Sequence, residues 1–261
     1  MFDRGLTFAQ SVYEVAPVIG GRVANWPHHA ARLAGSMQTA LIADDTDWPG
    51  VLAELIRRNG MDEGRVYLQV TAGSPGDRDF AVPQPPIPPT RIAYTQTASL
   101  LADPRADKGL RIILRPDLRW QLRAAKTTQL LYAVLMKEEA RLAGVDDVWL
   151  VEGGLITEAT SQNAHIVDAR GVLVSHPVDR GVLPGVTRIS VIEIACELGL
   201  EIEERPFTPD ELFAAREAFV SAAGTLVLPV VEVAGRAIGG GKPGPIAQAI
   251  RAAYIDRLRA R

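Results

Sequence analysis

Short apolar segments bounded by turn residues fill the sequence between residues 148 and 174, and they limit the fold to one with a β-rich core. Helical patterns, with apolar residues three and four apart, occur before and after this region. Strands and helices do not alternate as strictly as in a parallel α/β fold, so the pattern predicts the α+β class in two domains. The expected strands are 66–70, 91–96, 110–114, 148–151, 155–157, 164–167 and 172–174, and the expected helices are 26–41, 48–59, 187–198, 209–215 and 245–259.

Two segments interrupt the N-terminal part of the chain. Residues 73–89 are rich in glycine and proline, which excludes a helix or a central strand, and loops of this length are usually functional or disordered. A polar stretch follows the strand at 91–96. We therefore predict a small N-terminal α/β domain at 1–101, an interdomain linker at 102–108 and a larger β-rich C-terminal domain at 109–261.

The composition narrows the class of partner. With 47% hydrophobic residues among 261, the chain can bury an ordinary core without disulfides or metals. A net charge of −3 gives no electrostatic surface for nucleic acid, and no apolar run approaches the roughly 18–20 residues of a membrane helix. The single cysteine, Cys196, lies in an apolar run, where we expect a buried thiol. These features predict a cytoplasmic protein that acts on small molecules.

Lysine is scarce in this sequence. Only four of the 28 Lys and Arg residues are lysines, namely Lys108, Lys126, Lys137 and Lys242. An arginine cannot serve as an amine nucleophile at neutral pH, whereas a lysine can once its pKa is lowered. We expect Lys126 at the start of a helix, partly buried at a domain edge, and Arg119 and Arg123 would lower its pKa if they lie near it. A solvated lysine is the alternative. The expected buried stripe of this helix is Leu130, Leu131, Val134 and Leu135.

Two further segments could carry chemistry. Residues 181–188, Gly-Val-Leu-Pro-Gly-Val-Thr-Arg, form a glycine-bounded loop that leads directly into a helix. Free N–H groups at a helix start bind phosphate, and the Thr187 hydroxyl would add a donor; an ordinary helix cap is the alternative. The polar run at 157–163 lies between two strands, and its alternative is a solvated turn.

Two other patterns do not indicate a site. The Gly-Gly-Gly-Lys segment at 239–242 resembles a phosphate loop, but Pro243 stands where a hydroxyl residue should follow the lysine. We interpret this segment as a flexible connector. The histidines have no metal-binding spacing with acidic or cysteine partners, so we predict no metal site.

Several short motifs follow one another in a characteristic order over nearly the whole chain. They are Asp3-Arg4-Gly5, Ser11–Val15, His28/His29 to Arg32-Leu33 with Ser36, Ala125-Lys126, Ile156–Glu158 to Asn163, Leu183–Arg188, and Ala218–Ser221 to Pro229-Val230. Each motif alone is modestly specific, and their order and spacing together are strong. In this order the chain resembles the fold-type IV pyridoxal-phosphate enzymes, the family of D-amino-acid aminotransferase, branched-chain aminotransferase and aminodeoxychorismate lyase.

The resemblance implies that the chain binds pyridoxal 5'-phosphate. Lys126 would hold the cofactor as a Schiff base and, as a free amine, shuttle the proton between the substrate Cα and the cofactor. Glu158 would face the pyridine nitrogen and keep it protonated. The other implied cofactor contacts are a phosphate pair with Arg32, helix N-terminal donors at Val186 and Thr187, a ring-face contact with Leu183 and a backbone N–H at Ala223, with Ser221 as the alternative to the last.

The substrate residues depart from the family pattern. Tyr13 would line the substrate pocket. D-amino-acid aminotransferases have an Arg-x-His motif that binds the substrate carboxylate, whereas the matching loop here reads Asp77-Arg78-Asp79. Arg78 is the candidate there, and its acidic neighbours would oppose anion binding. Family members usually have a β-hairpin before the Asp-Arg-Gly motif, which begins here at Asp3, so we expect that hairpin to be absent or truncated.

The implied activity is a ping-pong transfer of an amino group from an amino acid to a 2-oxo acid. D-amino acids such as D-alanine are the preferred donors, and a homodimer is the expected assembly. Alternatives with the same fold are a branched-chain aminotransferase, an (R)-amine transaminase and the lyase. The alternative from another class is a non-enzymatic phosphate-binding module, and a visible colour of the purified protein would distinguish that class from the enzymes.

Overall fold

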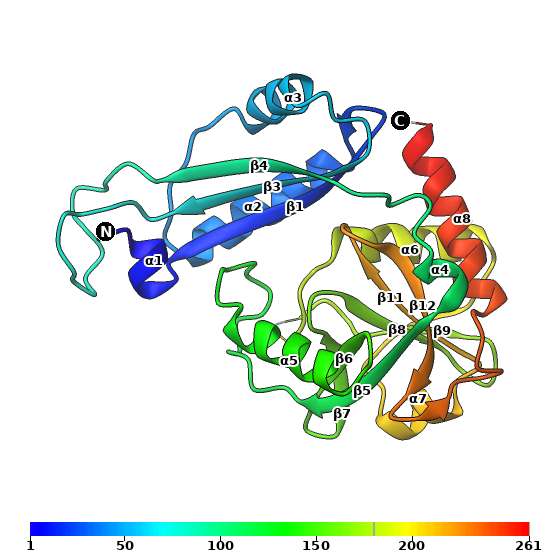
Figure 1. Ribbon diagram of the computed structural model, residues 1–261. Coiled ribbons are helices and arrows are strands. Elements are labelled where there is room, and N and C mark those ends of the chain that lie inside the picture. Colours follow the sequence, from blue (N-terminus) through cyan, green and yellow to red (C-terminus); the bar gives the residue numbers. More distant parts are fainter. Residues whose placement is uncertain (180, 261) are drawn as a thin grey trace. The chain divides into compact units, whose positions relative to one another are not determined.

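The computed structural model describes residues 1–179 and 181–260 (Figure 1). The chain forms two compact units, one of Met1–Ser99 with Ala124–Leu130 and the other of Leu100–Arg123 with Leu131–Arg261. Each unit combines helices with its own sheet, so the predicted α+β class is confirmed.

The first unit contains a four-stranded antiparallel sheet in the order β2-β1-β3-β4. Alternate residues of β1 and β3, such as Val12 and Leu68, are buried against Leu33 of α2 and Leu52 of α3, so these helices cover one face of the sheet. The bounds are α1 (Arg4–Phe8), β1 (Ser11–Ile19), β2 (Arg22–Val23), α2 (Trp26–Thr39), α3 (Trp48–Arg58), β3 (Gly64–Thr71) and β4 (Arg91–Thr97).

The glycine- and proline-rich segment predicted at 73–89 contains neither helix nor strand. The buried guanidinium of Arg4 in α1 donates hydrogen bonds to the carbonyls of Asp79 at 2.6 Å, Phe80 at 3.1 Å and Ala81 at 3.1 Å. A charged donor that binds three successive carbonyls restricts the backbone of a loop. The N-terminal helix therefore anchors this loop to the first unit.

The segment 124–130 leaves the second unit and packs with the first. Thr127 forms an antiparallel bridge with Val12, and the N–H of Thr128 donates to the Ser11 carbonyl at 3.1 Å. The free edge of β1 thus satisfies the backbone groups of this segment. The sequence analysis had placed these residues within the C-terminal domain and at the start of a helix, because it had no means to detect pairing with a strand so distant in sequence.

The second unit contains a nine-stranded mixed sheet. Its strand order is β10-β9-β8-β11-β12-β5-β6-β7, and β13 pairs with β12. The bounds are α4 (Arg105–Lys108), β5 (Leu110–Pro116), α5 (Leu131–Leu142), β6 (Asp147–Glu152), β7 (Leu155–Ala159), β8 (Asn163–Val167), β9 (Leu173–Ser175), α6 (Val186–Glu197), β10 (Ile202–Glu204), α7 (Pro209–Ala214), β11 (Glu217–Ala222), β12 (Leu226–Val233), β13 (Arg236–Ala237) and α8 (Pro245–Arg259).

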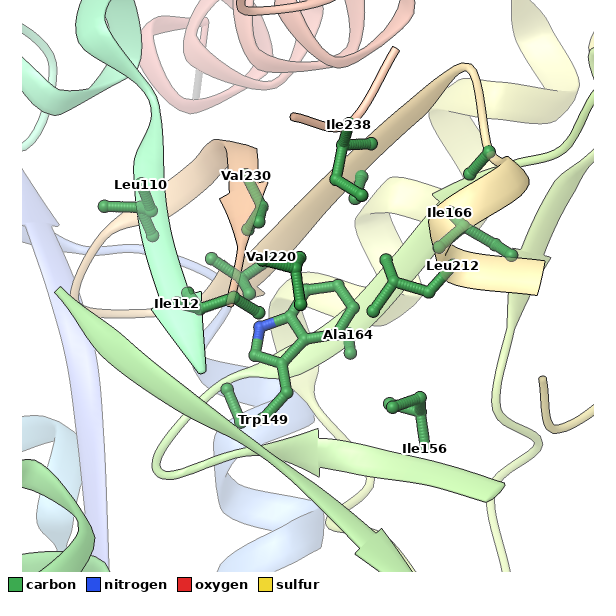
Figure 2. Packing of buried hydrophobic residues seen from close by; sticks show 14 of the residues in the cluster. Leu110, Ile112, Trp149, Ile156, Ala164, Ile166, Leu212, Val220, Val230 and Ile238 are labelled. Atoms are coloured by element: carbon green, nitrogen blue, oxygen red, sulfur yellow. The ribbon is translucent and has the colours of Figure 1, made fainter. Parts of the chain in front are cut away.

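A hydrophobic core fills the space enclosed by this sheet. Figure 2 shows the Trp149 indole of β6 in the middle of the cluster, among side chains that include Ile112 of β5 and Leu212 of α7. Trp149 is fully buried, and burying an aromatic ring of this size is among the largest single contributions to a core. The strands that carry Glu158 and Asn163 are thereby held on a rigid framework.

Two expectations about burial are wrong. Leu131, Val134 and Leu135 of α5 are 71%, 60% and 52% exposed, because this helix packs on the sheet through its other apolar side, with Ala140 buried. Cys196 is exposed, because α6 buries Ile194 and Ala195 on the opposite side of the helix. Within the described residues, none of the helices is long and apolar enough to cross a membrane.

Candidate active site

Lys126 lies in an extended segment of the first unit. Its N–H donates to the Ser36 hydroxyl of α2 at 3.0 Å, and its carbonyl accepts from the Tyr13 N–H at 3.0 Å. The Lys126 Nζ lies 4.2 Å from the centroid of the Tyr13 ring, whose quadrupole attracts an ammonium group. The backbone of this lysine is therefore fixed by hydrogen bonds on both sides, and its amine lies over an aromatic face.

Arg32 is part of a buried ion cluster in the same unit. It donates to Glu14 through Nε and Nη2, both at 2.7 Å, and the Nδ1 of His29 lies 2.8 Å from a Glu14 oxygen. Burial opposes ionisation of Glu14, but the charge and hydrogen bonds of Arg32 outweigh it and lower the pKa of Glu14 to about 2. Burial lowers the pKa of His29, so its imidazole is neutral at physiological pH. Glu14 is therefore a permanent anion that fixes the guanidinium of Arg32.

Three tyrosines stack across the sheet of the first unit, on the face opposite the core. The ring centroids of Tyr13 and Tyr67 are 5.5 Å apart, and those of Tyr67 and Tyr94 are 4.8 Å apart. The Tyr67 hydroxyl donates to Gln69 at 2.7 Å, and burial together with the neighbouring tyrosines raises the pKa of Tyr67 to about 12. Tyr67 therefore stays neutral, and its ring supports the ring of Tyr13 next to the lysine.

Arg78, the candidate for binding the substrate carboxylate, lies in the exposed loop of the first unit. Its guanidinium carbon is 4.9 Å from the ring centroid of Phe8 and 5.1 Å from that of Phe80. Phe80 is 75% exposed. Two aromatic rings thus hold the cation on a surface loop whose backbone Arg4 anchors.

Glu158 lies in β7 and is buried, so the polar run at 157–163 is not a solvated turn. One of its carboxylate oxygens accepts from Arg119 at 2.6 Å, and the other accepts from the Asn163 amide at 3.1 Å and the Leu183 N–H at 3.2 Å. Burial raises the pKa of Glu158, and Arg119 opposes that shift. A carboxylate accepts about four hydrogen bonds, so these three donors leave capacity for one more.

A second buried acid, Asp117, holds the Arg119 side chain that binds Glu158. Asp117 accepts from the Nε of Arg119 at 3.0 Å, from its Nη2 at 2.7 Å and from the Thr157 hydroxyl at 2.7 Å. Arg119 therefore bridges two buried carboxylates. The sequence analysis missed Asp117 and considered Arg119 only as a possible neighbour of Lys126.

The loop at 181–188 leads into α6 as predicted. Gly185 is the N-cap of this helix and supplies no side-chain hydrogen bond. The hydroxyl of Thr187 is buried and has no hydrogen-bond partner in the described part of the chain. Arg188 anchors the first turn by donating to Ser175 at 3.0 Å and Glu204 at 2.5 Å. The helix start thus presents backbone N–H groups beside an unsatisfied hydroxyl, which is the donor set that binds a phosphate.

The remaining predicted position, Ala223, lies in the turn between β11 and β12. The Ser221 hydroxyl nearby lies 2.9 Å from the Nε2 of His165. Burial lowers the pKa of His165 to about 3, so this histidine is neutral. Ser221 is therefore occupied within the protein, which leaves a backbone N–H of the turn as the candidate donor. The described residues contain no cluster of three or more His, Cys, Asp or Glu side chains able to hold a metal ion.

We expect Gly185→Ala to disturb this helix start. A Cβ at Gly185 would lie 1.9 Å from the Asn163 amide oxygen, and Asn163 also donates to the Leu183 carbonyl at 2.9 Å. Displacing Asn163 should lower the free energy of unfolding by about 1–3 kcal/mol, as measured by urea denaturation. Gly35→Ala in α2 is the control, since nothing lies within 4 Å of its added Cβ and alanine favours a helix. Equal stability of the two variants would contradict this packing argument.

Comparisons with known proteins assign this chain to a family. The model of the family Amino-transferase class IV matches residues 11–233. The D-alanine aminotransferase of Bacillus licheniformis is 33% identical over 98% of this chain and 90% of its own length. That of Staphylococcus aureus (strain N315) is 31% identical over 97% of this chain and 89% of its own length. The chain therefore belongs to the class IV aminotransferase family.

Solved structures agree with the fold-type IV architecture expected from the sequence. The T.th. branched-chain amino acid aminotransferase with pyridoxamine 5'-phosphate superposes with a TM-score of 0.86, at 26% identity over 100% of this chain and 88% of that one. The branched-chain aminotransferase of Escherichia coli gives a TM-score of 0.87 at 24% identity, over 99% and 88% of the two chains, and supports the fold alone. The predicted fold-type IV class is thus confirmed.

Proposed function

We propose that this chain is a pyridoxal-phosphate-dependent transaminase that transfers an amino group from a D-amino acid to a 2-oxo acid by a ping-pong mechanism. The observation that carries the proposal is Lys126, a half-buried lysine whose backbone is hydrogen-bonded on both sides and whose amine lies 4.2 Å from the centroid of the Tyr13 ring. Membership of the class IV aminotransferase family, whose members use pyridoxal phosphate, supports the cofactor. A carbonyl cofactor requires such an amine for covalent attachment.

The residues present fit pyridoxal 5'-phosphate. The unsatisfied Thr187 hydroxyl at the start of α6, with the N–H groups of Val186 and Thr187, suits the phosphate, and we assign Arg32 to the same group. The spare hydrogen-bonding capacity of the buried Glu158 carboxylate suits a protonated ring nitrogen. Leu183 would contact the ring face, and the N–H of Ala223 would be a further phosphate donor.

When bound, the cofactor supplies a conjugated ring that takes up the electrons of the substrate Cα–H bond. In our proposal the Nζ of Lys126 would accept the proton from the substrate Cα and pass it to the C4′ carbon of the cofactor, and in the second half of the cycle it would carry a proton from C4′ back to Cα. Glu158 holds a proton on the ring nitrogen. The Tyr13 ring orients the lysine amine and shields one side of it from water.

The preference for D-amino acids rests on the D-alanine aminotransferases among the relatives. We assign Tyr13 to the substrate pocket and Arg78 to the substrate carboxylate. The second candidate activity is branched-chain amino acid transamination, which the solved structures at 25–26% identity favour. An (R)-amine transaminase and the lyase are the other activities that this fold supports.

A panel of half-reactions tests the proposal. The protein saturated with pyridoxal phosphate is mixed, without an acceptor, with D-alanine, L-leucine, L-glutamate or an (R)-amine, and the visible absorbance of the cofactor is followed. We expect D-alanine to bleach the absorbance fastest. Faster bleaching by L-leucine would favour the branched-chain activity, and a protein that never acquires visible absorbance would refute the cofactor assignment.

We also propose that the protein assembles as a homodimer. The support is the exposed apolar stripe of α5, formed by Leu131, Val134 and Leu135, because soluble monomers seldom expose a contiguous apolar patch of this kind. A second copy of the chain would remove these side chains from water.

Arg32→Ala should weaken cofactor binding much more than it changes the chemistry. We expect the dissociation constant for pyridoxal phosphate to rise about 10- to 100-fold, the usual effect of losing a charge-assisted hydrogen bond. Saturating cofactor should restore most of the activity. Glu14→Gln is the matched variant, since it removes the partner of Arg32 but keeps the cation, and its effect should be smaller. Failure of saturating cofactor to restore any activity, with the fold intact by circular dichroism, would contradict the phosphate assignment.

A further inference from the structure

Arg119 occupies an unusual position in the second unit. Its side chain is 15% exposed, and it donates to Asp117 through Nε and Nη2 and to Glu158 through Nη1. Each of the three guanidinium nitrogens of Arg119 therefore donates to a buried carboxylate. Arg119 also donates its backbone N–H to Asp117 at 3.1 Å, which fixes the guanidinium relative to the main chain.

Asp117, which binds Arg119, is itself held by the sheet. The N–H of Asp117 donates to the Val151 carbonyl of β6 at 2.8 Å, and its carboxylate accepts from Thr157, the residue before Glu158 in β7. Asp117 is therefore held by β6 and by β7, the strand that carries Glu158, and it fixes Arg119 beside that strand. A guanidinium held in this way cannot swing away from Glu158 without breaking two hydrogen bonds to Asp117.

The charges of the cluster do not balance. Arg123 pairs with Glu152 at 2.7 Å and lies 3.5 Å from Asp117, so the cluster contains three carboxylates and two guanidiniums. One negative charge is left over, on groups of which Asp117 and Glu158 are buried. A buried excess charge is costly unless a cation or a proton compensates it. A protonated ring nitrogen next to Glu158 would supply that cation.

We infer that Arg119 is a positioning residue that keeps Glu158 ionised, so that the proton stays on the ring nitrogen of the cofactor rather than on the carboxylate. The inference rests on the proposed function, because it concerns the same residue and the same cofactor. The groups that face Glu158 are Arg119, the Asn163 amide, the Leu183 N–H and the negative charge of Asp117. Of these groups only Arg119 is a cation. Burial and Asp117 both raise the pKa of Glu158, and after the loss of Arg119 no positive charge would oppose them.

The sign of the pH effect follows from this arrangement. Without Arg119, the pKa of Glu158 rises further, and the carboxylate is ionised only at higher pH. The acid limb of the pH profile for Cα proton removal should therefore move to higher pH in Arg119→Gln. We expect a shift of about one to two pH units, corresponding to the loss of one charge-assisted hydrogen bond. At neutral pH the half-reaction should slow about 10- to 100-fold.

The test uses the full chain loaded with pyridoxal phosphate that carries ¹⁵N in the ring. The ¹⁵N chemical shift reports directly whether the ring nitrogen holds a proton, independently of turnover. In the wild type it should report a protonated nitrogen across the pH range, and in Arg119→Gln it should move toward the unprotonated value. Arg119→Lys, which keeps the charge, should restore most of the wild-type shift. Arg119→Met fills the volume without charge and serves where Arg119→Gln fails to fold.

Arg115→Gln is the matched control. Arg115 is the penultimate residue of β5, four residues before Arg119, and pairs with Glu139. About a third of each of these two side chains is exposed, so the loss of Arg115 should change neither the ¹⁵N shift nor the pH profile. A wild-type ¹⁵N shift and an unmoved acid limb in Arg119→Gln or Arg119→Met would overturn the inference about Arg119. A wild type that binds no labelled cofactor would instead refute the proposed function, so the two failures are distinguishable.

Discussion

Replacing Lys126 with alanine should abolish covalent attachment of pyridoxal phosphate and slow the half-reaction with D-alanine at least about 10²- to 10⁴-fold, the usual contribution of a positioned general acid-base group. The physical reason is that no other group in our proposal can move the Cα proton. The measurement is borohydride reduction of the loaded protein, followed by peptide mapping of the pyridoxyl group. The label should lie on Lys126 in the wild type and be absent from Lys126→Ala.

The other lysines provide the controls for this experiment. Lys137 pairs with Asp147 at 2.8 Å, and Lys108 and Lys242 are exposed. None of the three lies over an aromatic ring in the described residues. Lys137→Ala should therefore keep both the label and the turnover. A label on Lys137, or undiminished turnover by Lys126→Ala, would overturn the assignment and favour the non-enzymatic phosphate-binding protein.

Local sequence signals predicted most of the secondary structure. The capping box of Thr208 and Glu211, with Pro209 in the first turn, sets the start of α7 as expected, because its hydrogen bonds form between neighbouring residues. The β-branched and aromatic residues at 66–70 likewise predicted a strand, which is β3. These features depend on residues close in sequence, so they could be read without knowledge of the tertiary structure.

The burial of α5 could not be predicted in the same way. This helix has two apolar sides, one with Leu131 and Leu135 and another with Met136 and Ala140. Helical periodicity identifies both sides but does not say which one packs on the sheet. The choice depends on β6, where Val148 and Leu150 contact the Ala140 side. The longer side chains were therefore assigned to the core incorrectly.

The ion pairs of the candidate site were only partly accessible from the sequence. Glu14 occupies a core-facing position of β1 between Val12 and Ala16, and a charged residue on the apolar side of a strand signals a buried partner. The partner could not be identified, because Arg32 reaches Glu14 from a helix 18 residues away in sequence. The same holds for Arg119 and Glu158, which are 39 residues apart. Such pairs depend on tertiary packing rather than on local pattern.

Glu158→Gln should preserve cofactor binding but slow removal of the substrate Cα proton about a hundredfold or more, which corresponds to about 2.7 kcal/mol or more in the activation barrier at about 1.4 kcal/mol per tenfold. An amide carries no charge to hold a proton on the ring nitrogen, so the ring becomes a weaker electron sink. Single-turnover kinetics with D-alanine would measure the step. Glu139→Gln is the matched control, because Glu139 of α5 also pairs with an arginine, Arg115, but is about a third exposed and lies outside the cluster of Asp117, Arg119 and Glu158.

Arg119 and Glu158 together allow a stricter test through a double mutant. If Arg119 acts only through the charge of Glu158, then adding Arg119→Gln to Glu158→Gln should slow the proton step little beyond the effect of Glu158→Gln alone. Residues that act as one unit show such non-additivity, whereas independent effects multiply. Stability measured by urea denaturation separates this result from a general loss of structure. Multiplicative rate losses would show that Arg119 acts independently of Glu158. An unimpaired Glu158→Gln enzyme would show that the carboxylate does not set the protonation of the ring nitrogen.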